Sequence, residues 1–160
     1  MMIMAHPGSS IESILFTEFG DYFLGGDATV TASLNWFLHI PGVGTVGGTE
    51  SFVDTQSSGL TSDTWSLGLD IDLVNGTVNG SPLVDLTTGQ PITIPDDLNK
   101  VTFEFDNSLL ASAVGPVDTA FIAKKSSNGV QVHTDCVPEP SALGLALMAM
   151  LIPFTRLRKS

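Results

Sequence analysis

Positive charge is nearly absent from most of this 160-residue chain. No Lys or Arg occurs before Lys100. Of the 17 acidic and 6 basic side chains, one acidic and three basic lie after residue 137, and the remaining 16 acidic and 3 basic ones give residues 1–137 a net charge of −13. With this negative charge, residues 1–137 repel phosphate backbones and anionic lipid heads. Nucleic acid is therefore not expected as a partner.

Motifs of known catalytic and metal sites are also missing. Cys136 is the single cysteine, so an intrachain disulfide is excluded, and the residue is either unpaired or linked to another molecule. His6, His39 and His133 are scattered, without the spacing of zinc ligands. Nucleophile-elbow and phosphate-loop motifs do not occur. We therefore predict no enzymatic activity, and no catalytic, cofactor-binding or metal-binding residues.

The first ten residues lack the features of a secretory signal. Such a signal has a positive n-region and an apolar h-region. Residues 1–10 contain no Lys or Arg and a single four-residue apolar stretch. The expectation is a truncated or misassigned start, or export by an unusual route.

Alternation of apolar and polar residues is the main structural signal. A period of two places the apolar side chains on one face of a β-strand. The strongest predicted strands are 28–40, 65–73 and 101–106, and weaker ones are 49–55, 77–86, 119–124 and 129–134. The pattern predicts a core that includes Trp36, Leu67, Leu69, Ile71, Phe103 and Phe105.

Glycine- and asparagine-rich turns separate these strands. They include Gly25-Gly26-Asp27, Pro41-Gly42, Asn75-Gly76 and Asn79-Gly80. Short strands at this spacing predict a mainly β fold, an antiparallel β-sandwich or jelly roll over residues 28–135. Residues 1–27 are treated as a separate N-terminal segment, to which the pattern assigns no definite structure.

Two segments show helical patterns, and the first of them also has strand spacing. Ser9-Ser10-Ile11-Glu12 resembles a helical capping box, whereas Leu15, Thr17 and Phe19 have strand spacing. Residues 108–114 are expected to form a helical turn between strands.

Paired carboxylates suggest two kinds of chemistry. Asp70 and Asp72 project from one strand face, and with Asn75 they offer oxygen ligands to Ca²⁺. The spacing departs from the EF-hand loop, so a solvated polar face is the plainer interpretation. Carboxylate pairs also serve glycoside hydrolysis, but a chain this acidic contains such pairs by chance.

Aromatic and asparagine residues raise the possibility of sugar chemistry. Trp36, Trp65 and Tyr22 can stack on sugar rings, although both tryptophans lie on apolar strand faces and are expected in the core. Asn75 and Asn79 match N-glycosylation sequons, and tight Asn-Gly turns account for them equally well.

The last 24 residues, 137–160, have three successive parts. Val137-Pro138-Glu139-Pro140 is stiff and extended. Residues 142–154 carry no charge and form a helix of roughly 20 Å, short for a hydrocarbon core of about 30 Å. Arg156, Arg158 and Lys159 follow, and positive charge stays on the cytoplasmic side. We expect a C-terminal transmembrane-type helix; a helix packed on the body is the alternative.

This tail resembles the PEP-CTERM sorting signal of Gram-negative bacteria. The resemblance is carried by Val137, Pro138, Glu139, Pro140, Arg156, Arg158 and Lys159, within a tail spanning 136–160. It implies export, a temporary inner-membrane anchor with a cytoplasmic C-terminus, and processing by an exosortase. Members of the family are associated with exopolysaccharide production, which implies a place in the cell envelope or the extracellular matrix.

The sequence therefore supports three hypotheses. The first is a surface-sorted structural or adhesive protein of the polysaccharide matrix, with an exosortase, the membrane and exopolysaccharide as partners. The second is a carbohydrate-binding or carbohydrate-active β domain. The third is a protein whose tail is simply its last helix.

Overall fold

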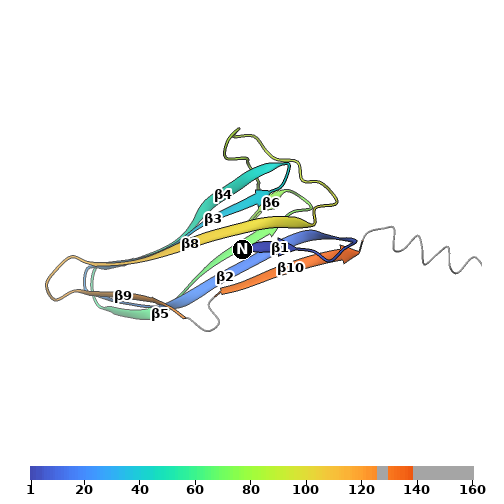
Figure 1. Ribbon diagram of the computed structural model, residues 1–160. Coiled ribbons are helices and arrows are strands. Elements are labelled where there is room, and N and C mark those ends of the chain that lie inside the picture. Colours follow the sequence, from blue (N-terminus) through green and yellow to red (C-terminus); the bar gives the residue numbers. More distant parts are fainter. Residues whose placement is uncertain (126–129, 139–160) are drawn as a thin grey trace, which may run out of the picture.

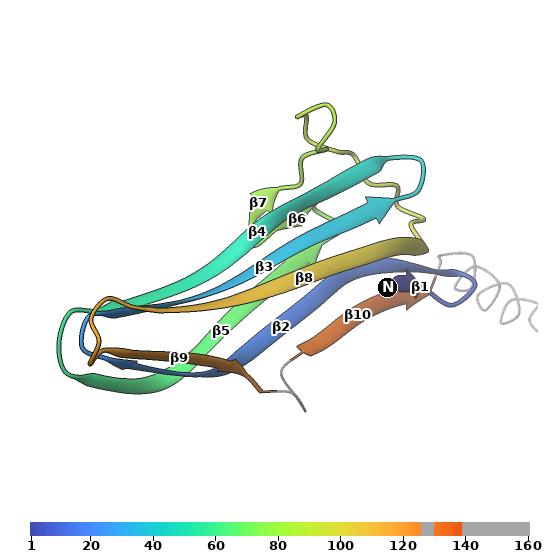
Figure 2. The ribbon, with the colours of Figure 1, turned by 60° about the vertical axis from the view of Figure 1, so that its left-hand side comes forward.

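The protein is built from long β-strands. The structure, a computed structural model, describes residues 1–125 and 130–138. Their strands form two antiparallel sheets that face each other across one core (Figures 1 and 2). In chain order the strands are β1 (Met2–Met4), β2 (Ser9–Gly25), β3 (Ala28–Ile40), β4 (Gly44–Gln56), β5 (Leu60–Asp72), β6 (Thr77–Val78), β7 (Ser81–Pro82), β8 (Lys100–Ala113), β9 (Thr119–Lys124) and β10 (Val130–Pro138).

The first sheet has the order β1-β8-β3-β4 and is centred on β3. This strand pairs with β4 along its whole length and with β8 from residue 28 to 39. Its alternating side chains from Ala28 to Ile40 explain the placement, since one face is buried at every second residue. The predicted strand 28–40 is confirmed with both of its ends.

The second sheet is organised around β2, which lies between β5 on one edge and two strands on the other. The strand β10 pairs with residues 9–18 of β2, and β9 pairs with residues 20–25 of the same edge. These two strands therefore lie end to end along β2, an arrangement visible in Figure 2. The β domain thus includes residues before residue 28, and its last strand runs to Pro138.

One hydrophobic core fills the space between the sheets. It includes Trp36, Leu67, Leu69, Ile71 and Phe103, as predicted from their alternation. Phe105 was predicted to be buried with them but is 37% exposed. β1 pairs with β8 at residues 100–102 and so covers that part of its edge. Phe105 lies on β8 beyond these residues, where β1 no longer covers the edge.

Three local predictions are corrected. The helical reading of residues 9–18 is wrong, because β2 satisfies its backbone groups by pairing on both edges, and this outweighs a local capping pattern. Ile14 and Phe16 form its buried face, while Leu15 is exposed. The helical turn at 108–114 is also wrong, since β8 continues to Ala113 in register with β3. Residues 77–86 contain two short strands in place of one long one.

The predicted Asn-Gly turns are present. Val78 pairs with Ser81, so Asn79-Gly80 forms a two-residue hairpin loop. Both residues have positive φ, 46° and 78°, as the favoured hairpin turn requires. The side chain of Asn79 also accepts a hydrogen bond from the Asp70 amide at 2.9 Å, which ties this turn to β5. The turn geometry thus gives these asparagines a structural role.

The alternation along β5 predicts very different costs for two neighbouring substitutions. Leu69 is fully buried, whereas Asp70 is exposed. Leu69→Ala should lower the free energy of unfolding by about 2–5 kcal/mol. Asp70→Ala is expected to change it by less than about 0.5 kcal/mol. Urea denaturation of both variants provides the measurement, and equal losses would contradict the observed register.

Candidate functional site

A carboxylate is buried between the two sheets. Glu18 has no exposed side-chain surface, although its position on β2 belongs to the apolar face that contains Ile14 and Phe16. A charge in such a place is costly unless partners compensate for the lost water. This residue is therefore the most unusual feature of the core.

Two side chains from other strands meet Glu18. Lys124 of β9 places its Nζ atom 2.8 Å from the Oε1 atom of Glu18. Asn107 of β8 donates a hydrogen bond from Nδ2 to the same oxygen. The second carboxylate oxygen, Oε2, is buried and accepts no hydrogen bond from a described residue. We call these three residues, Glu18, Asn107 and Lys124, the inter-sheet triad.

The absence of a side chain at Gly20 allows Lys124 to approach the Glu18 carboxylate. Lys124 pairs with Gly20, two residues along β2 from Glu18 and on the same face. A Cβ atom at Gly20 would lie 2.6 Å from the Nε1 atom of Trp65. The Trp65 indole occupies the space that this Cβ atom would need, and it donates a hydrogen bond of 3.1 Å to the Ala123 carbonyl. The missing side chain thus lets β9 lie close to the core.

Apolar side chains surround the inter-sheet triad. Leu67, which pairs with Glu18 across β2 and β5, is 6% exposed. The rings of Phe16 and Phe105 have centroids 4.5 Å apart, and they flank Glu18 and Asn107 along their strands. Lys124, with 29% of its side chain exposed, connects the triad to solvent.

A second polar contact joins the sheets at the opposite edge. The hydroxyl of Tyr22 on β2 donates a hydrogen bond of 2.6 Å to Asp54 on β4. This bond to a carboxylate, with burial and the negative charges of Asp54 and Asp63, raises the pKa of Tyr22 to about 12. Tyr22 is 6% exposed, so it is not available to stack on a sugar.

The outer face of the first sheet carries a shallow hollow of about 320 Å³. Phe37, which is 46% exposed, lines it with His39, Thr45 and Glu104. His39 is held by a contact of 3.1 Å between its Nδ1 atom and the Thr45 hydroxyl. Both tryptophans lie in the core, as predicted. Phe37 is thus the aromatic residue of this hollow.

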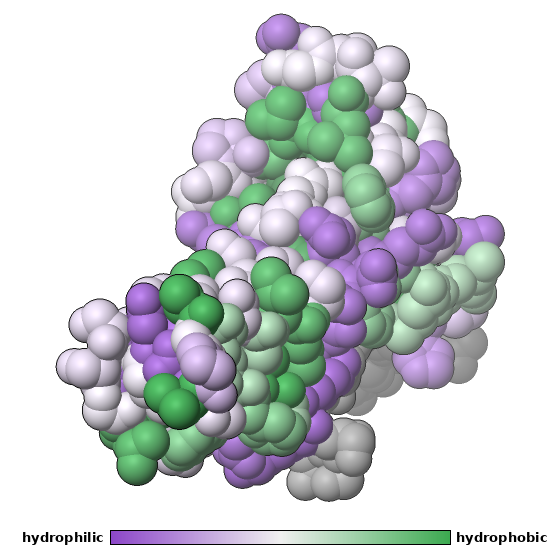
Figure 3. Space-filling model, turned by 90° about the vertical axis from the view of Figure 1, so that its left-hand side faces the viewer, coloured by the Kyte–Doolittle hydropathy of each residue, from purple (hydrophilic) through white to green (hydrophobic). Residues whose placement is uncertain are grey.

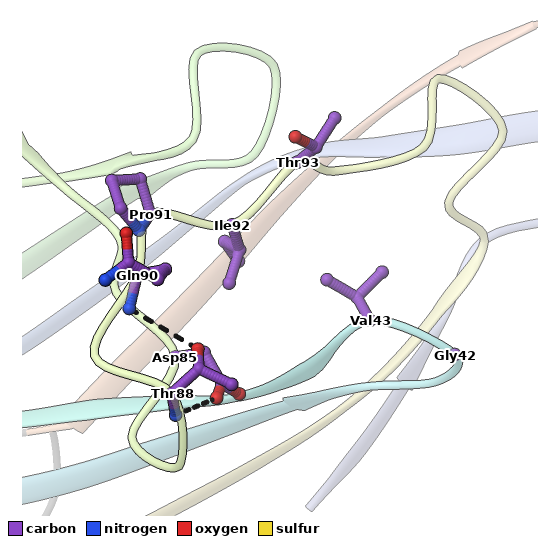
Figure 4. A pocket seen from close by; sticks show the side chains of 8 residues that line it. All are labelled: Gly42, Val43, Asp85, Thr88, Gln90, Pro91, Ile92 and Thr93. Carbon is purple, nitrogen blue, oxygen red and sulfur yellow. Dashed lines mark hydrogen bonds between the residues drawn. The ribbon is translucent and has the colours of Figure 1, made fainter.

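Another hollow lies beside the loop after β7 (Figure 4). Its acidic member, Asp85, accepts hydrogen bonds from the backbone amides of Thr45, Thr87 and Thr88. These bonds, led by that from Thr88, lower the pKa of Asp85. The carboxylate therefore serves to fold its own loop against β4.

The predicted calcium ligands serve a turn. Asp72 accepts hydrogen bonds from the amides of Val74 and Asn75 and from the Asn75 side chain, and the last of these contributes most to its lowered pKa. Asp70 lies on the same strand face and is exposed. In the described part of the chain, no three His, Cys, Asp or Glu side chains are grouped to hold a metal ion.

The predicted sorting residues lie partly within the structure. Val137 and Pro138 end β10 and pair with Ser10 and Ser9 of β2. Glu139, Pro140, Arg156, Arg158 and Lys159 lie outside the described residues. Within 1–125 and 130–138, no helix has the length and hydropathy needed to cross a bilayer.

The sequence held a signal for the inter-sheet triad that the strand predictions did not use. Glu18 interrupts the apolar series Ile14, Phe16, Tyr22 and Leu24 once β2 is read as a strand. Asn107 follows Phe103 and Phe105 in the same way on β8. A polar residue at an inward position of a strand requires a partner.

Comparisons with known proteins give no relatives: no family model, curated protein or solved structure matches this chain.

The contact between Tyr22 and Asp54 predicts a stability change in alkali. The pKa of Tyr22 is higher in the folded protein than its usual 10.0, so the contribution is complete below pH 10 and is lost as pH rises towards 12. Tyr22→Phe should cost about 1–2 kcal/mol at neutral pH, and its difference from the wild type should shrink above pH 10.

Ultraviolet titration gives a direct check, because Tyr22 is the single tyrosine of the chain. Its absorbance should titrate near pH 12 in the wild type and closer to 10 in Asp54→Asn. A wild-type midpoint at 10 would refute the role of this contact.

Proposed function

We propose that this chain is a surface-sorted structural or adhesive protein of the bacterial cell envelope or polysaccharide matrix, processed by an exosortase and without enzymatic activity. The observation that carries the proposal is the tail 137–160, with its Pro-Glu-Pro, apolar and basic parts. In this proposal residues 142–154 form a membrane helix, and the basic end stays in the cytoplasm.

The position of the tail supports this proposal. Val137 and Pro138, the first residues of the proposed sorting sequence, are also the last two residues of β10 in the described part of the chain. Cleavage directly after this point would release the domain with its strands complete. The acidic body also suits a hydrated, exported protein, since like charges keep copies apart in solution.

The far end of the domain supports a contact role. Figure 1 shows the β4–β5 turn and the β8–β9 loop at the end opposite to the end of β10. Figure 3 shows apolar surface gathered on this end. Leu60 begins β5 after the β4–β5 turn, Val117 lies in the β8–β9 loop and Phe121 lies on β9, and they are 78%, 89% and 56% exposed. With the tail in the membrane, this surface would face outward, where an adhesive contact is made.

Mass spectrometry of protein from the native cell tests the sorting proposal. The mature C-terminus should lie between Pro138 and Ser141. In cells without the exosortase, full-length protein should remain in the membrane fraction. A double variant, Glu139→Gln with Pro140→Ala, leaves β10 unchanged and should accumulate unprocessed. Secreted wild-type protein that still ends at Ser160 would disprove processing.

Carbohydrate binding at the outer face of the first sheet is the second candidate function. It is favoured by the hollow in which exposed Phe37 lies beside His39 and Glu104. An aromatic ring offers an apolar platform to a sugar, and the polar groups beside it offer hydrogen bonds.

Affinity electrophoresis in gels that contain the native exopolysaccharide tests this second function. Phe37→Ala should weaken retardation about tenfold, the equivalent of about 1.4 kcal/mol. Leu15→Ala removes an exposed apolar side chain from the other sheet, away from the far-end surface, and serves as the control. Equal retardation of wild type and Phe37→Ala would exclude this face as the binding site.

A further inference from the structure

We propose that this protein forms a covalent cross-link within its own chain, an isopeptide bond between the Nζ atom of Lys124 and the side-chain amide carbon of Asn107. Glu18 carries the proton in this reaction. The reaction occurs once per molecule, so it is distinct from catalytic turnover of a substrate. The proposal stands on the inter-sheet triad and is independent of the tail.

The three reacting groups are already in contact. The Lys124 amine and the Asn107 amide nitrogen both lie within hydrogen-bond reach of Oε1 of Glu18. Two groups bound to one atom lie at most about 6 Å apart, the sum of two hydrogen bonds. Holding an amine and an amide as neighbours replaces the encounter of two free reactants and removes much of its entropic cost.

The reaction begins with a proton transfer between two groups in contact. An ammonium cannot attack a carbonyl carbon, so Lys124 must first lose a proton. Glu18 is completely buried among apolar side chains, and its Oε2 atom accepts no hydrogen bond from a described residue. Passing the proton from Lys124 to Glu18 removes both charges from this low-dielectric site.

The atoms then balance as follows. Neutral Lys124 attacks the amide carbon of Asn107, whose Nδ2 atom already faces Glu18. The new N–C bond forms as the carbonyl π electrons move to oxygen. Glu18 transfers a proton from the attacking nitrogen to Nδ2, the C–Nδ2 bond breaks, and ammonia leaves. The carbonyl re-forms, and no oxidant or cofactor is needed.

Solvent access supports release of the product. Lys124 is 29% exposed, so the site opens to water on the β9 side while Glu18 remains buried. Ammonia can leave by this route. The new bond joins β8 of the first sheet to β9 of the second, across an edge where the backbone pairing of β8 with β1 has already ended.

The neighbouring lysine provides an internal comparison. Lys125 forms an ion pair of 3.0 Å with Asp21, and both side chains are about half exposed. Both side chains reach solvent, and within the described residues no side-chain amide bonds to this pair. Lys125 therefore has a carboxylate partner without the burial that the proposal requires.

Peptide mapping of the full-length folded protein tests the cross-link. A protease that cuts on the amino side of aspartate cleaves before Asp106 and Asp118 and so separates Asn107 from Lys124. In the wild type the two fragments, 106–117 and 118–134, should stay joined, with a mass one ammonia below their sum. Separate fragments of unmodified mass would overturn the proposal.

The joined fragments also exclude a simpler loss of ammonia. Cyclisation of Asn107 onto its own backbone gives the same mass change but leaves the fragments separate. That outcome would count against the cross-link. Sequencing of the joined species by tandem mass spectrometry should place the link at Lys124 and Asn107, and a link at Lys125 would contradict the assignment.

Three variants assign the roles. Lys124→Arg and Asn107→Ala remove a reacting group, and Glu18→Gln keeps the size of the proton carrier but removes its acid function. Each should give separate fragments, whereas Lys125→Arg should retain the link. A joined species in Glu18→Gln would refute the role of Glu18. The wild-type digest decides the existence of the bond even where a variant does not fold.

Discussion

The backbone pairing of β2 is the constraint on which the rest of the structure depends. This strand of 17 residues bonds to β5 along one edge and to β9 and β10 along the other. Three segments distant in the sequence are thereby brought to one strand. Because β2 is paired on both sides, its inward side chains are fixed in register against the first sheet, and every contact across the core follows from that register.

Among the described side chains, two polar contacts cross a mainly apolar interior, and they differ in kind. The hydroxyl of Tyr22 meets the carboxylate of Asp54 as a neutral donor with a charged acceptor, and the geometry satisfies both. At Glu18 one oxygen has two partners while the other has none among the described residues. A stable packing contact accounts for the first arrangement. The second leaves a buried acceptor unused, which a structural role alone does not explain.

Strand positions could be predicted from the sequence where the side chains of one strand face are buried and those of the other face are more exposed. Alternation located residues 28–40 with both ends, because every second side chain of that strand is buried. It also located residues 119–124, although no side chain there is fully buried. For residues 9–18 the strand spacing competed with a capping pattern, and the strand alternative is the correct one. For 108–114 the Ala and Leu residues favour a helix locally, and the predicted helical turn is wrong. In both cases pairing with a distant strand decided the conformation, and such pairing cannot be read from a single segment.

The inter-sheet triad could not be predicted for a related reason. Its members come from β2, β8 and β9, and their approach depends on a glycine, Gly20, whose value appears once Trp65 and β9 are in place. Val137 and Pro138 were predicted from sequence order as part of a sorting signal, which stays a prediction, and in the structure they are the last residues of β10.

The placement of β10 has a mechanical consequence. In the described part of the chain, β10 ends at Pro138 and is antiparallel to β2 over residues 9–18. A pull on Pro138 along the strand axis, opposed at the far end of the domain, loads the hydrogen bonds between β10 and β2 together. Strands loaded lengthwise must slide past each other to separate, whereas strands peeled from one end break their bonds in turn. This domain is therefore built to resist tension from its C-terminal side.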